Sequence, residues 1–242
     1  MTLDNNIIQA ALDKTTISSN PTVNDEQMDA LFYKPTCDTD IIAPFGPTIG
    51  YLKLSSSFVD SINAYVSKDL PDFSGDVVGK VNQELRWTDE MSHLLLNEIK
   101  NFTFKYVDSS LQRGSYNTIR LDLSQMNYKL DVQSAWFVRQ YETEYNPIHV
   151  HNGMYSCVGY LKLPEGIEKE WEEEARSNKT STHGHIAFYH NYGQNGDFII
   201  RPSVGDFYIF PANLSHCVYP FYTKGERRSF SANLTFLPQP KE

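Results

Sequence analysis

Six of the seven histidines lie between residues 149 and 216, and two pairs among them are separated by a single residue. His149 and His151 form one pair, and His183 and His185 form the other. On a strand this spacing places both side chains on the same face. Two such imidazoles and a third ligand can occupy one face of an octahedral metal ion, leaving positions open for a co-substrate and O₂. His216, which precedes a predicted strand, is the natural third ligand for His149 and His151.

Two alternatives to this metal site remain open at this stage. His149 and His151 are equally compatible with packing or surface histidines. His183 and His185 form a rival pair, although Gly184 between them indicates a turn or the start of a strand.

A cationic strand near the C-terminus supplies a second chemical feature. Strand alternation places Arg227, Ser229, Ser231 and Asn233 on one face. A guanidinium inside a β-sandwich must be paired, and the carboxylate of a ligand is a suitable partner. Two interpretations compete with this one. Arg227 could pair with an internal Asp or Glu, or Arg228 could face inward instead.

The elements that must position these residues are mostly short strands rich in aromatic and β-branched residues. No long helix separates them, which favours an antiparallel sandwich or jelly roll over a parallel α/β sheet. The predicted strands are Ala135–Tyr141, Tyr155–Leu163, His185–His190, Phe198–Arg201, Phe207–Phe210, Cys217–Tyr222 and Ser229–Phe236.

Two helices are predicted before the strands, and one acidic insertion lies among them. Apolar periodicity predicts helices over 55–66 and 88–106, with Thr88 as the N-cap of the second. Residues 167–177 are expected to form a short acidic helix or a long loop, which could line the mouth of a site and favour a cationic or peptide substrate. We expect an N-terminal arm over 1–38, surface-bound or mobile, then one domain over 39–242 with helical support at 50–110 and a jelly-roll core at 127–237.

Composition excludes several classes of protein. The net charge of −9 over 242 residues argues against nucleic acid as a partner of the whole domain. Three widely spaced cysteines without a CxxC motif exclude a zinc ribbon and favour reduced thiols in a cytoplasm. The N-terminus shows neither a signal peptide nor a membrane span, so we expect a cytoplasmic protein, in the host cytoplasm if a phage encodes it.

The order of these motifs resembles the 2-oxoglutarate/Fe(II) dioxygenase superfamily over roughly residues 40–237. It looks closest to a branch of 2-oxoglutarate oxygenases in marine bacteria and tailed phages that is related to prolyl hydroxylases. The specific elements are Asn-Pro-Ile-His-Val-His at 146–151, Gly-Asp-Phe-Tyr-Ile-Phe-Pro-Ala-Asn-Leu-Ser-His at 205–216, and Gly-Glu-Arg-Arg-Ser at 225–229.

The resemblance implies a double-stranded β-helix that uses Fe(II), 2-oxoglutarate and O₂. It places His149 and His216 on the two histidine ligand positions and Arg227 on the residue that holds the distal carboxylate of 2-oxoglutarate. Ser229 falls on the hydroxyl partner of that arginine, and Tyr160 falls near a further hydroxyl position. Tyr141 is implied as a part of the co-substrate wall.

The sequence departs from the family pattern at one ligand. His151 stands where the pattern has Asp or Glu, so all three expected ligands are histidines. Three-histidine iron sites occur in cupin-type oxygenases, and bound 2-oxoglutarate, a dianion, could balance the remaining charge. A second register, with His151 as first ligand and Gly153 at the carboxylate position, would resemble a halogenase.

The function implied is hydroxylation of a C–H bond in an unidentified small molecule, peptide or protein, with release of succinate and CO₂. Two other functions remain compatible with the sequence. One is a three-histidine cupin-type dioxygenase that binds iron without 2-oxoglutarate. The other is a non-catalytic jelly-roll module that binds carbohydrate or belongs to a virion, because the fold hosts both kinds of function.

Overall fold

The C-terminal strand β11 (Arg227–Gln239) lies between β4 (Asn127–Gln140) and β6 (Tyr155–Lys162), antiparallel to both. In this computed structural model the described residues are 37–42, 46–66, 70–73, 79–113, 127–178, 182–190 and 197–239. They lie in one compact unit, Tyr33–Glu242. The predicted arm over 1–38 falls almost entirely outside the described residues, so the domain boundaries stay predictions.

The strands of the described residues form two antiparallel sheets, one of seven strands and one of four. The large sheet has the order β1-β2-β9-β6-β11-β4-β3, and the small sheet has the order β5-β10-β7-β8. The remaining strands are β1 (Thr39–Ile42), β2 (Ile49–Lys53), β3 (Gln83–Arg86), β5 (Asn146–His149), β7 (Ile186–Tyr189), β8 (Asp197–Ile200), β9 (Asp206–Pro211) and β10 (Ser215–Val218). This arrangement confirms the predicted mainly-β, double-stranded β-helix fold.

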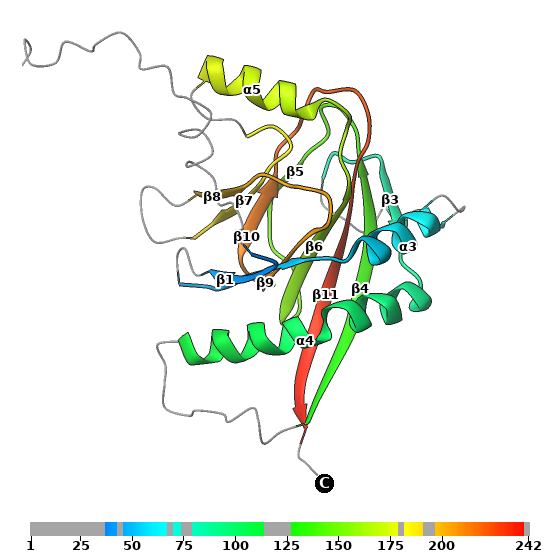
Figure 1. Cartoon of the computed structure of the whole chain (residues 1–242), viewed down its shortest axis with the longest axis vertical. Helices are drawn as coiled ribbons and strands as arrows, with labels where there is room; N and C mark the ends of the chain where they lie inside the picture. The colour runs from blue at the N-terminus through cyan, green and yellow to red at the C-terminus, as the bar shows by residue number, and fades with distance from the viewer. Residues whose placement is uncertain are drawn as a thin grey trace, which may run out of the picture. The chain divides into compact units, whose positions relative to one another are not determined.

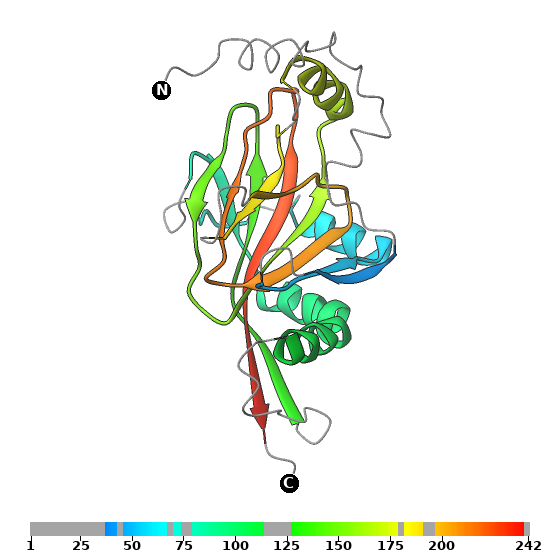
Figure 2. The ribbon, with the colours of Figure 1, turned by 90° about the vertical axis from the view of Figure 1, so that its left-hand side faces the viewer.

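Helices α3 (Ser56–Val66) and α4 (Asp89–Arg113) cover one face of the large sheet, and the small sheet faces the other (Figures 1 and 2). Both helices begin at side-chain caps, of which Thr88 was predicted from the sequence. The Ser55 hydroxyl accepts a hydrogen bond from the Phe58 amide at 3.2 Å, and the Thr88 hydroxyl accepts one from the Met91 amide at 3.4 Å. None of the helices in the described part of the chain is both long and apolar enough to cross a bilayer.

Two apolar layers lie on opposite faces of the large sheet. The layer beneath the helices is rich in aromatic rings, with Trp87 lying 4.7 Å from Phe137 and 5.1 Å from Phe230 between ring centroids. The layer between the two sheets includes Tyr160, Phe188, Tyr208 and Phe210 among others. Burial of these surfaces supplies the main driving force for the fold.

The structure corrects several predicted element boundaries. Each of the seven predicted strands overlaps an observed one, but β10 spans Ser215–Val218 and not 217–222, so His216 lies within the strand and does not precede it. Strands β1, β2, β3 and β5 were not predicted; β3 and β5, for example, hold few of the aromatic and β-branched residues that mark the equally short β7 and β8. The acidic insertion forms helix α5 (Ile167–Asn178), and α4 continues past the predicted end at Tyr106.

Gly159 on β6 generates a prediction about stability. A Cβ atom at this position would lie 2.2 Å from Cε1 of Phe230, whose ring is fully buried. Replacing Gly159 with Ala should therefore lower the free energy of unfolding by about 1–3 kcal/mol, measured by urea denaturation, because the core must shift to admit the methyl group.

The double variant Gly159→Ala/Phe230→Leu is the matched control. The smaller Leu side chain relieves the overlap, so the double variant should lose less stability than the sum of the two single variants. Wild-type stability in Gly159→Ala would show that the Phe230 ring is not held over the glycine.

Candidate metal centre

Pairing between two strands of the small sheet brings the predicted histidine ligands together. Strands β5 and β10 are antiparallel, and His149 lies directly opposite His216. His151 lies just beyond β5, and its backbone amide donates a hydrogen bond to the Ala212 carbonyl at 2.8 Å. One ligand atom from each of the three rings lies within 4.8 Å of the other two. Within the described ranges, this is the group of His, Cys, Asp or Glu side chains close enough to hold a metal ion.

Backbone carbonyls orient two of the three imidazoles. Nδ1 of His149 lies 2.7 Å from the Pro147 carbonyl, and Nδ1 of His216 lies 2.9 Å from the Leu214 carbonyl. A carbonyl only accepts, so each Nδ1 carries the proton and each Nε2 keeps its lone pair. Such a bond at the second ring nitrogen is the usual support of a metal-binding histidine.

Burial keeps all three imidazoles neutral at ordinary pH. It lowers the pKa of His149, and burial together with the neighbouring His149 lowers the pKa of His151 to about 4. Burial and His149 lower the pKa of His216 to about 3. Because a ligand must be deprotonated to bind a metal, these rings bind without first releasing a proton.

The rival pair of histidines does not converge on a metal site. His183 forms an ion-pair contact with Glu170 on α5 at 2.8 Å. Nδ1 of His185 lies 2.7 Å from the His183 carbonyl, and its ring lies against Trp171. Because His149 belongs to the cluster, the ligand assignment that begins at His149 is favoured over the halogenase-like assignment that begins at His151.

Arg227 lies in the space between the sheets, so of the two arginines that alternation left open it is Arg227 that faces inward. Its side chain is only 2% exposed and its guanidinium lies 5.5 Å from the centre of the Tyr160 ring. One guanidinium nitrogen donates a hydrogen bond to the Gly184 carbonyl at 2.6 Å. Among the described residues no carboxylate pairs with Arg227, which weighs against the interpretation that it serves an internal Asp or Glu.

Two buried polar atoms beside each other lack partners within the described structure. Nε of Arg227 and the hydroxyl of Tyr160 are both buried and make no hydrogen bond there. Burial raises the pKa of Tyr160 to about 12, so its hydroxyl keeps its proton and can donate. A cation and a hydroxyl donor buried together suit the carboxylate of a bound molecule, which would supply the missing acceptor.

The other two residues predicted for the co-substrate differ in their placement. Ser229 is buried, shares the inward face with Arg227 and lies opposite Tyr160 on β6. Tyr141 follows β4, and its ring lies 5.9 Å from the Arg139 guanidinium. The structure thus places Ser229 beside Arg227. The roles of Ser229 and Tyr141 stay predictions.

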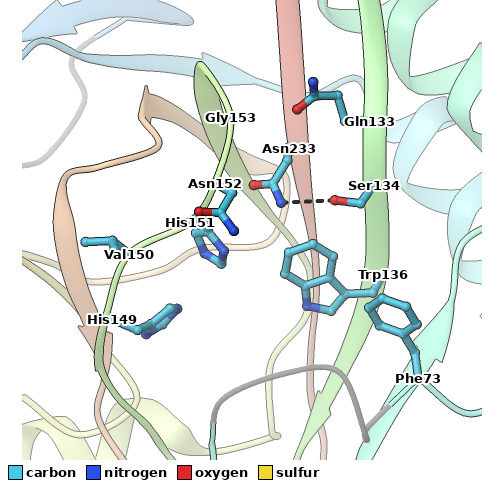
Figure 3. A pocket seen from close by; sticks show the side chains of 10 residues that line it. All are labelled: Phe73, Gln133, Ser134, Trp136, His149, Val150, His151, Asn152, Gly153 and Asn233. Atoms are coloured by element: carbon cyan, nitrogen blue, oxygen red, sulfur yellow. Dashed lines mark hydrogen bonds between the residues drawn. The ribbon is translucent and has the colours of Figure 1, made fainter.

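A cavity of about 600 Å³ opens beside His149 and His151 (Figure 3). The sequence patterns did not single out most of its walls. Trp136 faces inward from β4, and its ring lies between His151 and Phe73 (Figure 3). The other lining residues are Gln133, Ser134, Val150, Asn152, Gly153 and Asn233. Trp136 was detectable as an aromatic residue on a predicted strand, but its partners from distant segments were not.

The expectation that the acidic insertion lines the mouth of the site is not met at this cavity. None of its described lining residues comes from α5. The carboxylate of Glu170 on α5 instead accepts hydrogen bonds from the backbone amides of Tyr222 and Thr223, at 2.8 and 2.6 Å. The helix therefore fastens the loop that leads into β11.

Comparisons with known proteins point to one family. Residues 134–233 match the family model described as "Putative 2OG-Fe(II) oxygenase", which confirms the family predicted from the motifs. A comparison with curated proteins found no match. No comparison bears on the predicted marine and phage branch.

Several solved structures resemble the chain at low identity. A 2OG-Fe(II) oxygenase family oxidoreductase from Burkholderia pseudomallei is 11% identical, with a TM-score of 0.48 over 77% of this chain and 83% of that one. The viral collagen prolyl hydroxylase of Paramecium Bursaria Chlorella virus-1, in a 2OG complex, is 15% identical, with a TM-score of 0.46 over 82% and 96%. A Pseudomonas putida prolyl-4-hydroxylase is 14% identical, with a TM-score of 0.46 over 86% and 95%.

The first prediction from this site concerns its ligands. Replacing His216 with Ala should weaken binding of Co(II), used as an air-stable probe, by more than about 100-fold, because one of three ligands is lost. Calorimetric titration of the apo protein measures the affinity. His93→Ala, on the exposed face of α4, is the control and should bind as the wild type does. Equal affinities in the two variants would remove His216 from the site.

The second prediction concerns pH. Protons compete with a metal only below the pKa of the free imidazole, and burial lowers the pKa of all three rings, to about 4 for His151 and about 3 for His216. The fall of Co(II) affinity with decreasing pH should therefore begin at a lower pH than ordinary imidazoles would give. A decline that begins near pH 6.5 would show imidazoles with ordinary pKa values.

Proposed function

We propose, from the membership of residues 134–233 in the 2OG-Fe(II) oxygenase family, that this protein is an Fe(II)- and 2-oxoglutarate-dependent oxygenase that hydroxylates a C–H bond of its substrate. The observation that carries the proposal is Arg227, a buried cation with no carboxylate partner in the described structure, beside the unbonded hydroxyl of Tyr160. This pair suits one end of a dicarboxylate. The histidine cluster supplies a metal site for the other end.

In this proposal His149, His151 and His216 would hold the iron. The carbonyls of Pro147 and Leu214 fix the rings of His149 and His216 so that each presents Nε2. When bound, Fe(II) with 2-oxoglutarate and O₂ supplies the oxidising chemistry, and succinate and CO₂ are the co-products. His151 replaces the usual carboxylate ligand, so the protein contributes no negative charge to the ion.

The side chains between the sheets hold the co-substrate in one orientation. Arg227 and Tyr160 donate hydrogen bonds to its distal carboxylate, with Ser229 as a third donor. Each bond from the guanidinium to a carboxylate contributes about 1.5–3 kcal/mol. The apolar layer around them, including Phe188 and Val158, excludes water and so strengthens the electrostatic interaction.

One observation favours a second candidate, a three-histidine dioxygenase that binds iron without 2-oxoglutarate. The metal-binding group contains histidines alone, as in cupin-type sites of that kind. That candidate gives Arg227 no task, which is why we place it second. The non-catalytic module predicts neither the histidine cluster nor the unpaired guanidinium.

The test is an anaerobic titration of the protein with Fe(II) and then with 2-oxoglutarate, followed in the visible spectrum. A weak charge-transfer band that requires both additions indicates chelation of the co-substrate by the iron. Replacing Arg227 with Gln should weaken 2-oxoglutarate binding by about 10- to 100-fold and leave iron affinity unchanged, because the charge-assisted bonds are lost.

Arg228→Gln is the matched control, since Arg228 is the next residue on β11 and binds Glu226 and Asn63. It should retain wild-type affinity for 2-oxoglutarate. Unchanged affinity in Arg227→Gln contradicts the proposed role of this residue. Iron binding without the band in the wild-type protein would support the second candidate, and no iron binding would overturn both.

A further inference from the structure

The cavity beside the histidine cluster carries no formal charge among its described lining residues. One wall is aromatic, with Phe73 and Trp136 separated by 6.0 Å between ring centroids at an interplanar angle of 30°. The polar groups are the amides of Gln133, Asn152 and Asn233 and the hydroxyl of Ser134 (Figure 3). Side-chain amides offer donors and acceptors together, so they suit a partner that has both.

A β-bulge places Gln133 at this cavity. On β4, Ser134 lies opposite Asn233 while Val132 lies opposite Leu234, so Gln133 is an extra residue without a partner on β11. Val132 packs towards the helices, whereas Ser134 lines the cavity. Bulges of this kind next to active sites redirect a side chain. A Cβ atom at Gly153, across the mouth, would lie only 2.9 Å from Oε1 of Gln133.

The remaining polar groups of the wall differ in what they can offer a substrate. Asn233 is already engaged, since its amide nitrogen donates to the Ser134 hydroxyl at 3.0 Å and its oxygen accepts from Ser156 at 2.7 Å. The Ser134 hydroxyl accepts that bond and can donate its own proton. Gln133 and Asn152 are exposed at the rim. The groups that can recognise a substrate are therefore Gln133, Asn152 and Ser134.

The charge of the site with metal and co-substrate bound also bears on the substrate, and this step rests on the proposed function. Three neutral histidines add no charge to Fe(II), so the ion, the 2-oxoglutarate dianion and Arg227 together leave one net positive charge, which disfavours a cationic substrate group. The described lining residues of the cavity offer no counter-charge to a substrate group of either sign. A charged substrate group placed there would lose hydration without gaining a partner.

We propose that this cavity selects an uncharged, amide-bearing substrate group that lies against Trp136, with Gln133 and Asn152 as specificity-determining residues. This differs from the cationic substrate that the acidic insertion suggested. The amide could belong to a peptide segment or to a small molecule, since both present the same donor and acceptor.

The experiment compares three probes of similar size on the full-length protein loaded anaerobically with Fe(II) and 2-oxoglutarate. N-acetyl-leucine N-methylamide is neutral, N-acetyl-leucine is anionic and leucine N-methylamide is cationic. Calorimetry should show the neutral probe binding at least about tenfold more tightly than either charged probe, because a buried charge there has no partner. No saturable binding of the neutral probe, or equal binding of a charged one, overturns the proposal.

The variant Gln133→Glu adds one negative charge with almost no change of shape. It should shift the preference towards the cationic probe by about tenfold or more, whereas Asn101→Asp, on the exposed face of α4, should leave the ranking unchanged. An unchanged ranking in Gln133→Glu contradicts the assignment of Gln133.

A capped, uncharged hexapeptide separates the two sources of the amide. Tighter binding than the neutral probe supports a peptide segment, and equal binding supports a small molecule. The visible band of the loaded protein is recorded before any probe is added. Its absence means that the proposed function has failed, whereas its presence without discrimination among the probes means that only this inference has failed.

Discussion

The alternation of side chains along β11 is the constraint on which both the core and the site depend. One face of the strand packs Phe230 and its neighbours beneath the helices, and the other points Arg227 into the space between the sheets. A slip of one residue would exchange the two faces. Glu226 helps to hold the register: burial would raise its pKa, but hydrogen bonds from Arg228 and Arg139 lower it to about 2. The ion pairs thus fasten β11 to β4 beside Arg227.

The two parts of the site come from different sheets, so sheet packing brings them into one interior. The histidines depend on pairing within the small sheet, where His149 faces His216. Arg227 and Tyr160 belong to the large sheet. Neither part needs a charged partner from the protein: the rings of the cluster are neutral, and the guanidinium has no carboxylate neighbour in the described structure. This combination of a neutral ligand set and an unpaired cation is suited to a dianion that binds both.

Much of this arrangement could be predicted from the sequence, because period-two patterns determine which face of a strand a residue occupies. Alternation narrowed the inward cation to Arg227 or Arg228, and spacing indicated that His149 and His151 act together, although His151 lies just beyond β5. Strands β3 and β5, which hold few aromatic or β-branched residues, left no readable pattern. The cavity wall could not be predicted either, because Phe73 and Trp136 come into contact only through tertiary packing and a bulge interrupts the alternation at Gln133. The role of α5 as a fastener of the loop before β11 likewise depends on long-range contacts of Glu170.

The bulge at Gln133 also bears on how such a site can change over generations. Because this residue has no partner on β11, deleting it would leave a regular ladder in which Val132 and Ser134 keep their present partners. Loss of a single codon would then remove one recognition group from the cavity while the rest of the sheet stays in register. If Gln133 recognises the substrate as proposed, substrate preference in this scaffold can change by insertion or deletion at one position, largely independently of the histidine cluster and Arg227.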